Sequence, residues 1–468
     1  MGSTFFGLNV AVSGLLAQQR ALNTVSHNLA NASTPGYSRQ RVDLAAALAH
    51  PVPALNTAVG PGQIGTGVVA EQHTRVRDRF ADITVRTQAA LVGEWGAMAS
   101  GLRALDTLID EPGETGITAL LSRYWSSWQG LTTQPDSAAS REAVRAAGVG
   151  LAEGLGDLRA RLGQAVDEAD ARIGLQVDRV NELAAQVNQV NQRIAAIAAT
   201  GQQPNDLRDL RDALVDELSG YASITVTAGA DDKLSIAIGA QVLLDGSTDT
   251  VNPLAVDSAG AATVGGAGTT LASGSLRGLV DLRDAVVGGP SGYIAQLDTL
   301  AGALIASVNG LHAAGVGMDG STGAPFFTGT SAADIAVSPA VRASVDAIAA
   351  AGTAAGLPGD ADTALAIAQL QFLVQPIGAS TTTLDGFYQQ IVARLGVDAD
   401  RAYRMEQVQD GVLAAAHARR DSVSGVNMDE EAADMVRFTK SYNAAARMVT
   451  AVDEMLETLI TRMGIVGR

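Results

Sequence analysis

The chain contains no cysteine, which excludes disulfide bonds, thiolate nucleophiles and zinc sites with cysteine ligands. Aromatic residues are also scarce, at 4% of 468 residues, whereas hydrophobic residues make up 47%. A core built mostly from small aliphatic side chains favours closely packed helices over large ligand pockets. No stretch approaches the roughly 18 unbroken apolar residues of a membrane span, so we expect no membrane insertion.

Positive charge is in deficit. Lysine and arginine together number 32, against 49 aspartate and glutamate residues, which gives a net charge of −17. Such a charge repels the phosphates of nucleic acids and of anionic lipids, so we expect neither as a partner. The N-terminal segment also lacks the positively charged start and the cleavage site of a secretory signal. We therefore expect no cleaved signal peptide, and export by another route.

An amphipathic helix is predicted for residues 5–29. Apolar side chains recur there at steps of three, four or seven residues, which places them in one stripe on the helix. The stripe consists of Phe5, Leu8, Val12, Leu15, Leu22 and Leu29. Pro35 disfavours helix at the preceding residue and Gly36 permits a tight turn, so the helix should end near residue 31.

A second long helix is predicted from residue 427 to residue 463. Asn427 is placed to cap its N-terminus, with Glu430 in the capping-box position. Its apolar stripe includes Met435, Tyr442, Val449, Val452, Leu456 and Leu459. Because neither terminal helix can bury its stripe alone, we expect them to pair as a coiled coil in an inner domain of residues 1–42 and 425–468. The apolar surface that this pair leaves uncovered should meet other subunits.

Helical patterns also fill most of the chain between the two ends. A spacing close to 3.5 between residues 155 and 197 predicts supercoiled helix packing. Asn205 is predicted to cap the next helix, and further helices are predicted at 276–311 and 383–423. These segments predict a helical-bundle middle domain of residues 43–220, 276–315 and 359–424.

The helical period is lost in two stretches. Residues 221–275 contain "SITVT" and "KLSIAI", which alternate apolar and polar residues and are separated by a turn-like "AGADD". Residues 316–358 are rich in Gly, Ala and Ser. Because both stretches would leave and re-enter one helical body, we expect them to form an outer β-rich domain together. The predicted fold is thus mainly α with a β-rich insertion.

The sequence offers no convincing catalytic or cofactor site. Its five histidines, His27, His50, His73, His312 and His417, include no pair at the spacing of helical metal ligands. Glycine patterns at 60–65 and 315–320 match the dinucleotide fingerprint in form, but the first lies in a Pro-rich loop and the second follows a helix. A nucleophile-elbow motif is missing. We therefore predict a non-enzymatic protein without metal or cofactor.

Two terminal motifs carry a family resemblance. "SGLLAQQRALNTVSHNLANASTPGYSRQRVDL", residues 13–44, closely resembles the N-terminal motif of bacterial flagellar rod, hook and hook-associated axial proteins. Its "TPGYSRQ" ending resembles the hook-associated version. Residues 424–460, "SGVNMDEEAADMVRFTKSYNAAARMVTAVDEMLETLI", resemble the C-terminal end of the same group, as do segments 205–219 and 274–286 between them.

This resemblance implies a structural subunit of the bacterial flagellum at the hook–filament junction. The terminal helices would stack in a tubular homo-oligomer, and Tyr37 and Arg39 would contact neighbouring subunits. The implied partners are the hook protein, the second hook–filament junction protein and an export chaperone on the C-terminal helix, with delivery to the cell exterior by type III export. Alternatives are a hook or distal rod subunit, or a flagellum-borne adhesin or hydrolase.

Overall fold

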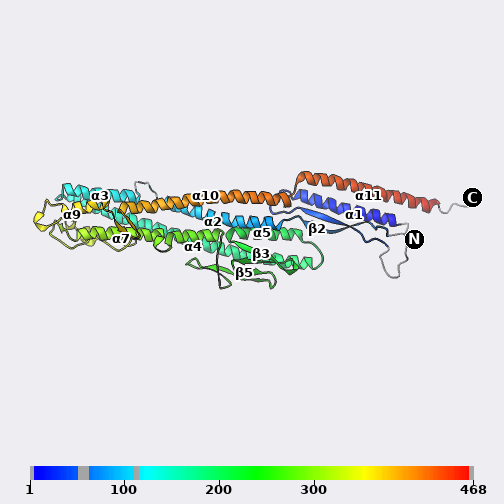
Figure 1. The fold of residues 1–468 in the computed structure, drawn as a ribbon, viewed down its shortest axis with the longest axis horizontal. Helices are drawn as coiled ribbons and strands as arrows, with labels where there is room; N and C mark the ends of the chain where they lie inside the picture. Colours follow the sequence, from blue (N-terminus) through cyan, green and yellow to red (C-terminus); the bar gives the residue numbers. More distant parts are fainter. Residues whose placement is uncertain (1–4, 51–62, 110, 112, 114, 463–468) are drawn as a thin grey trace, which may run out of the picture.

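The computed structural model is an elongated, mainly helical molecule, and it describes residues 5–50, 63–109, 111, 113 and 115–462. Helices α1 (Phe6–Ala30) and α11 (Met428–Arg462) lie side by side at one end of the long axis (Figure 1). Helices α3 (Ile117–Thr133), α7 (Tyr293–His312) and α9 (Asp362–Gln369) lie at the opposite end. The predicted class, mainly α with a β-rich insertion and long terminal helices, is confirmed.

The two terminal helices run antiparallel. The Asn28 amide nitrogen lies 3.1 Å from Glu431 Oε2, and a Cβ added at Gly14 would lie 4.0 Å from the Ala445 Cβ. The contacts advance along one helix as they recede along the other, which is the geometry of an antiparallel pair. The predicted pairing of the first helix with the last is therefore what the chain adopts.

A short β-hairpin follows α1. Gly36, with a φ of +79°, makes the tight turn that leads from the end of the helix into it. Strands β1 (Gln40–Ala46) and β2 (Val68–Arg75) pair antiparallel, with Gln40 opposite Arg75. Residues 51–62, which include most of the Pro-rich loop expected from the sequence, lie outside the described residues.

A long helical body occupies the middle of the molecule. Helix α2 (Arg79–Ile109) runs antiparallel to α10 (Leu384–Ser424), with Arg420 near Asp82 at one end and Arg103 near Glu406 further along. The 61-residue α4 (Ala138–Ala198) continues through both halves of this body. It is joined by α5 (Asn205–Tyr221) and α6 (Ser275–Val287).

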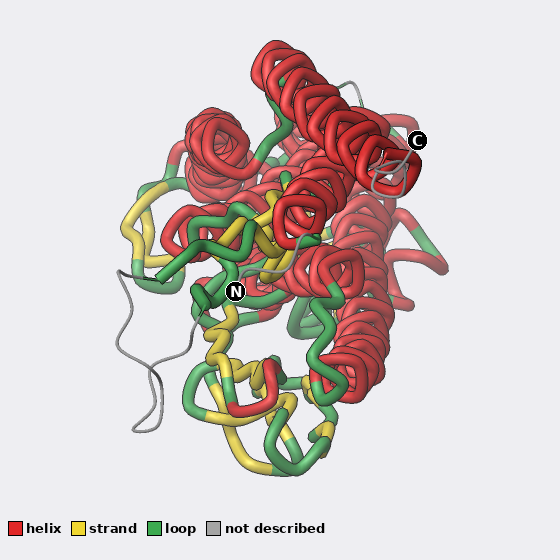
Figure 2. The backbone as a smooth tube through the Cα atoms, turned by 90° about the vertical axis from the view of Figure 1, so that its right-hand side faces the viewer, coloured by secondary structure: helices red, strands yellow, loops and turns green. Residues whose placement is uncertain are grey.

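Residues 224–269 form two small sheets on one side of this body (Figure 2). The first has the order β3-β4-β5-β6 (Ile224–Ala228, Leu234–Ile238, Gln241–Asp245, Thr250–Val251). The second has the order β7-β8-β9 (Leu254–Val256, Ala262–Val264, Ala267–Thr269). Alternate residues of β4, Ile236 and Ile238, are buried in one core with Val180, Leu183 and Val187 of α4, which we call the proximal core.

The segment after α7 belongs to a separate, distal core. It forms β10 (Val316–Gly317), β11 (Phe327–Thr328), β12 (Ala336–Val337), α8 (Pro339–Ala343) and β13 (Ala349–Ala351). Phe326 and Phe327 stack there against Tyr124, and Phe326 also contacts Trp128. Strands β14 (Gln375–Ile377) and β15 (Ser380–Thr382) form a hairpin before α10.

This separation differs from the single outer β-rich domain expected for 221–275 and 316–358. The buried side chains of the first segment lie in the proximal core and those of the second in the distal core. The sequence pattern shows that each segment leaves the helical body, but it does not show which stretch of the 61-residue α4 each one covers.

Two helix boundaries also differ from the sequence analysis. The helix expected at 276–311 is two helices, because Gly288, Gly289 and Pro290 lie in a break between α6 and α7. Asn205 does not cap α5 but is its first residue, and its amide donates to the His73 carbonyl and to Gln40 Oε1. The Asn205 side-chain amide thus binds the hairpin and not the free end of the helix. Asn427 does cap α11, since its Oδ1 accepts from the Asp429 amide at 3.0 Å.

Helix α7 meets the length and hydropathy limits of a membrane span. Its residues Leu297, Leu300, Leu304 and Val308 are buried in the distal core. A core helix of this kind satisfies the same limits.

Candidate assembly interface

The stripe predicted for α1 is not the face that α1 buries within the subunit. Phe5 and Val12 are exposed, and Leu8, Leu15, Leu22 and Leu29 are only half-buried. The buried face consists of Ala11, Ala17, Ala21, Thr24, Val25 and Asn28. Small side chains let α1 approach its neighbours closely, and the larger leucines are left at the margin of the contact.

Helix α11 buries only part of its apolar residues within the subunit. Val452 is buried, and Met435, Tyr442, Val449 and Leu456 are half-buried. Leu459, also predicted for the stripe, is exposed. A further set of exposed side chains was not singled out from the sequence and comprises Val436, Met448, Met455 and Ile460.

Among the residues that the structure describes, the terminal helix pair contributes none to either hydrophobic core. All buried side chains of the proximal and distal cores lie between Ala99 and Ala402. The pair therefore leaves a long apolar surface uncovered, and little apolar burial stabilises it within one subunit. An uncovered apolar surface on paired helices is typical of an interaction site.

A buried polar cluster fixes the turn after α1. The Asn28 side chain uses all four of its hydrogen-bonding positions. Its Nδ2 donates to the Gln40 backbone carbonyl and to Glu431 Oε2. Its Oδ1 accepts from the Gln40 backbone amide and from the Tyr37 hydroxyl. The Tyr37 hydroxyl also lies 2.9 Å from His27 Nδ1. Burial, followed by the nearby carboxylates of Asp206, Asp209 and Glu431, raises the pKa of Tyr37, which keeps its hydroxyl protonated.

Arg39 connects this turn to the start of α11. Its Nε donates to Glu431 Oε1 and its Nη1 to Glu430 Oε2, both at 2.7 Å, and its backbone amide donates to the Ser424 carbonyl at 2.9 Å. Glu430 thus binds Arg39, although the sequence placed it in a capping box. These contacts tie the turn to the end of α10 and the beginning of α11, and we call the whole cluster the joint.

The joint continues onto α5 through the two residues beside Arg39. The Ser38 hydroxyl donates to Asp209 Oδ1 at 2.7 Å, and the side-chain Nε2 of Gln40 donates to Asp206 Oδ1 at 3.1 Å. Arg75 of β2 donates to the same Asp209 oxygen at 2.7 Å. The inner helices are therefore fastened to the helical body by charged and polar contacts in place of an apolar core.

Asp212 of α5 is surrounded by three arginine side chains. Its carboxylate lies 2.9 Å from Arg75 Nη1 and 3.4 Å from both Arg77 Nη1 and Arg86 Nη2. Burial acts to raise the pKa of Asp212, but the attraction of Arg77, Arg75 and Arg86 outweighs it, so the pKa lies below its ordinary value. The carboxylate remains ionised in the folded protein at neutral pH.

This depressed pKa predicts loss of stability in acid. A carboxyl with a lower pKa in the folded state contributes stability above its unfolded pKa of about 3.9, and that contribution disappears as the pH falls through the folded value. We expect the unfolding temperature of the wild type to decrease once the pH drops below about 4. The Asp212→Asn variant should have a lower unfolding temperature at pH 7 and lose less of it between pH 7 and pH 3. Parallel pH curves for the two proteins between pH 7 and pH 3 would contradict this account.

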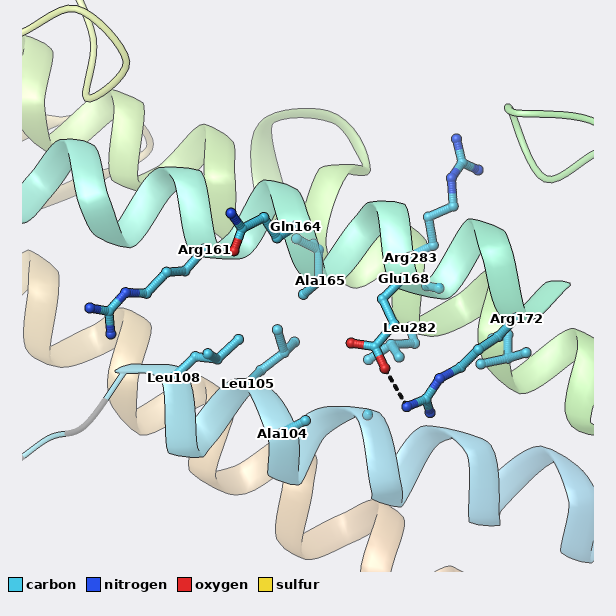
Figure 3. A pocket seen from close by; sticks show the side chains of 14 residues that line it. Ala104, Leu105, Leu108, Arg161, Gln164, Ala165, Glu168, Arg172, Leu282 and Arg283 are labelled. Atoms are coloured by element: carbon cyan, nitrogen blue, oxygen red, sulfur yellow. Dashed lines mark hydrogen bonds and ion pairs between the residues drawn. The ribbon is translucent and has the colours of Figure 1, made fainter. Parts of the chain in front are cut away.

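Two cavities lie beside the helices described above. The cavity of about 160 Å³ between α2, α4 and α6 has an apolar wall that includes Leu105 and Leu282, and an ion pair between Glu168 and Arg172 lies at its edge (Figure 3). A wider groove of about 740 Å³ lies between α1, β2 and the turn before α5, and it is lined mainly by polar side chains. Among the described residues, no group of three or more His, Asp or Glu side chains is placed to hold a metal ion.

Sequence reasoning identified Tyr37 and Arg39 but missed most of their partners. Asn28 and Glu431 bind each other across 403 positions of sequence, and Asp209, which binds the adjacent Ser38, lies 171 positions from it. No spacing in the sequence marks these polar residues as partners. The one available signal was the presence of three acids, Asp429, Glu430 and Glu431, in the first turn of α11. Of the three, only Glu430 has a role in the sequence-based prediction, as a capping-box residue.

Family comparisons cover both ends of the chain and its middle. Residues 102–327 match the helical domain of the flagellar hook-associated protein FlgK. Residues 8–37 match the flagella basal body rod protein family, and residues 420–462 match the C-terminal family of the basal body rod FlgEFG proteins. The last two matches meet at the joint.

Individual relatives agree with these families. Flagellar hook-associated protein 1 of Bacillus subtilis is 32% identical over 512 aligned positions that cover 100% of both chains. The protein of the same name from Salmonella typhimurium is 29% identical over 69% of this chain and only 59% of its own length. The flagellar hook junction protein FlgK from Burkholderia pseudomallei shares the fold, with a TM-score of 0.62 at 15% identity over 73% of this chain and 100% of that one.

Proposed function

The chain belongs to the flagellar hook-associated protein 1 family, and from that premise we propose that it is a structural subunit joining the hook of a bacterial flagellum to its filament. The observation that carries the proposal is the terminal helix pair, which lies outside both cores and presents an uncovered apolar surface. The full-length relative is a hook-associated protein, which favours this function over that of a hook or distal rod subunit.

We propose that copies of the chain pack through this surface into a tubular array. The exposed side chains Phe5, Val12 and Leu459, with the half-buried leucines beside them, would enter apolar contacts with neighbouring copies. Exposed Met448, Met455 and Ile460 would extend the same contacts along α11. Tyr37 and Arg39 are engaged inside the subunit, so their main contribution would be to hold α11 at the angle that the array requires.

The partners follow from the position of such a subunit. The array would contact the hook protein on one side and the second hook–filament junction protein on the other. Before assembly an export chaperone would cover the apolar surface of α11, and the chain would leave the cell through the flagellar type III apparatus without cleavage.

Deletion of the coding gene tests this function. We expect cells that build hooks of normal length, bear no filaments and release filament protein into the medium, as electron microscopy and analysis of the medium would show. A strain that keeps its filaments would overturn the junction proposal. A strain without hooks would instead indicate a hook or rod subunit.

The Met448→Asp variant separates assembly from folding. Met448 is 57% exposed, so we expect the purified variant to keep the unfolding midpoint of the wild type within about 2 °C. A charge buried between copies costs several kcal/mol when it is unpaired, so complementation of the deletion should fail. Leu175→Asp is the matched control, because Leu175 is exposed on α4, away from the terminal helices. Normal filament growth with Met448→Asp would argue against the proposed surface.

A further inference from the structure

The exposed sulfur atoms of the chain are concentrated on one helix. Because there is no cysteine, every sulfur belongs to one of nine methionines. Three methionines are exposed in the described part of the chain, Met428, Met448 and Met455, and all three lie on α11. The other described methionines are half-buried, namely Met98, Met318, Met405 and Met435. The described sulfur atoms that a solute reaches most readily therefore belong to the helix that pairs with α1 (Figure 1).

Met448 and Met455 also belong to one exposed apolar stripe of α11, which we call the methionine stripe. Its members recur at steps of three and four residues, so they share one side of the helix. They are Ala444, Met448, Ala451, Met455 and Leu459, and each of them is exposed. The two methionines and Leu459 supply the large side chains of the stripe, so a chemical change at the two sulfur atoms alters most of its apolar surface.

The methionine thioethers are the groups in this stripe that a peroxide oxidises. A sulfur lone pair attacks one oxygen of hydrogen peroxide, the S–O bond forms as the O–O bond breaks, and the released hydroxide leaves as water with the proton of the transferred hydroxyl. The sulfide is oxidised by two electrons to a sulfoxide, and the peroxide is reduced. No thiol of the chain competes for the oxidant, because the sequence contains no cysteine.

We propose that Met448 and Met455 are sites of oxidation by peroxides, and that their sulfoxides prevent the free subunit from assembling. The second half of this inference rests on the proposed tubular array, in which the methionine stripe faces a neighbouring copy. A thioether packs in such a contact as a flexible apolar group. A sulfoxide oxygen is instead a hydrogen-bond acceptor, and it would be buried against apolar side chains without a donor. The sensitive form is the subunit before incorporation, since the array would cover both sulfur atoms.

The modification half is tested by treating the purified chain with hydrogen peroxide. Mass spectrometry of its peptides should show sulfoxide at Met448 and Met455 forming several-fold faster than at the half-buried Met98 and Met405. The helical signal in circular dichroism should not change, because both oxidised side chains are exposed in the subunit. Equal rates at the four positions would contradict the assigned sites.

The effect on assembly is tested with a leucine variant. Leucine has nearly the volume of methionine and lacks sulfur, so the double variant Met448→Leu, Met455→Leu should form arrays as the wild type does. After peroxide treatment the wild type should need about tenfold more protein to assemble, as sedimentation would show, because a polar group is buried without a partner. The double variant should be unaffected by the same treatment, and a methionine sulfoxide reductase should restore assembly of the oxidised wild type.

Met428→Leu is the matched control for this experiment. Met428 is as exposed as Met448 and lies on the same helix, but the 20 positions between them turn the helix by about 200°, which places Met428 outside the stripe. This variant should stay as sensitive to peroxide as the wild type. Equal sensitivity of the wild type and the double leucine variant would overturn the proposed effect on assembly. Failure of the untreated chain to form arrays would count against the proposed function, while the peptide analysis would still decide whether Met448 and Met455 are the preferred sites.

Discussion

The Val452→Asp variant should lose the terminal helix pair. Val452 is 9% exposed and is the only position of the predicted α11 stripe that the described structure buries fully. An unpaired carboxylate there costs several kcal/mol, and no hydrophobic core is available to compensate, because neither core contains a residue of α1 or α11. We expect rapid proteolysis within the two terminal helices, a lower helical signal in circular dichroism and no array formation.

The control for this experiment lies on the same helix. Ile460 is 80% exposed, so Ile460→Asp introduces the same charge without burying it in the subunit. We expect its helical signal and protease resistance to match those of the wild type. If Val452→Asp also matched the wild type and still assembled, the contact between α1 and α11 would not be what holds the inner domain together.

Asn28→Asp should open the joint. The substitution keeps the size of the side chain but replaces an amide that donates to Gln40 and Glu431 with a carboxylate oxygen. That oxygen would face the Gln40 carbonyl and the buried Glu431 carboxylate, so two hydrogen bonds are lost and two like charges meet away from solvent. We expect a loss of about 3 kcal/mol in the free energy of unfolding, measured by urea denaturation.

Two comparisons identify the cause of this loss. Asn23→Asp makes the same chemical change at an exposed position of α1 and should alter the free energy of unfolding by less than about 0.5 kcal/mol. In a Glu431→Gln background the Asn28→Asp substitution should cost less, because the charge opposite it has been removed. Equal costs in both backgrounds would show that repulsion from Glu431 is not the reason.

Much of the architecture could be predicted from sequence because it depends on local patterns. The breaks at Pro35 and Gly36, the cap at Asn427 and the alternation in "KLSIAI" each act within a few residues, and each produces the expected element. The break after Val287 was missed although Gly288 and Pro290 mark it, because the apolar period appeared to continue on the far side.

The candidate interface was only partly accessible to the same reasoning. A stripe of Leu, Val and Phe marks α1 as amphipathic, but alanines such as Ala17 and Ala21 form the buried face. Helical periodicity gives weight to large apolar side chains, whereas the closest approach of two helices favours small ones. The predicted stripe thus lies at the margin of the contact inside the subunit.

The sequence by itself determined that both ends of the chain are amphipathic helices with more apolar surface than one partner can cover, since helical periodicity and turn residues are local properties. Only the tertiary structure decided which residues fasten those helices to the body. Asn28, Arg39, Glu431 and Asp209 meet through contacts that span up to 403 positions, and the position of a hydrogen-bond partner so distant in the chain leaves no periodic trace in the sequence.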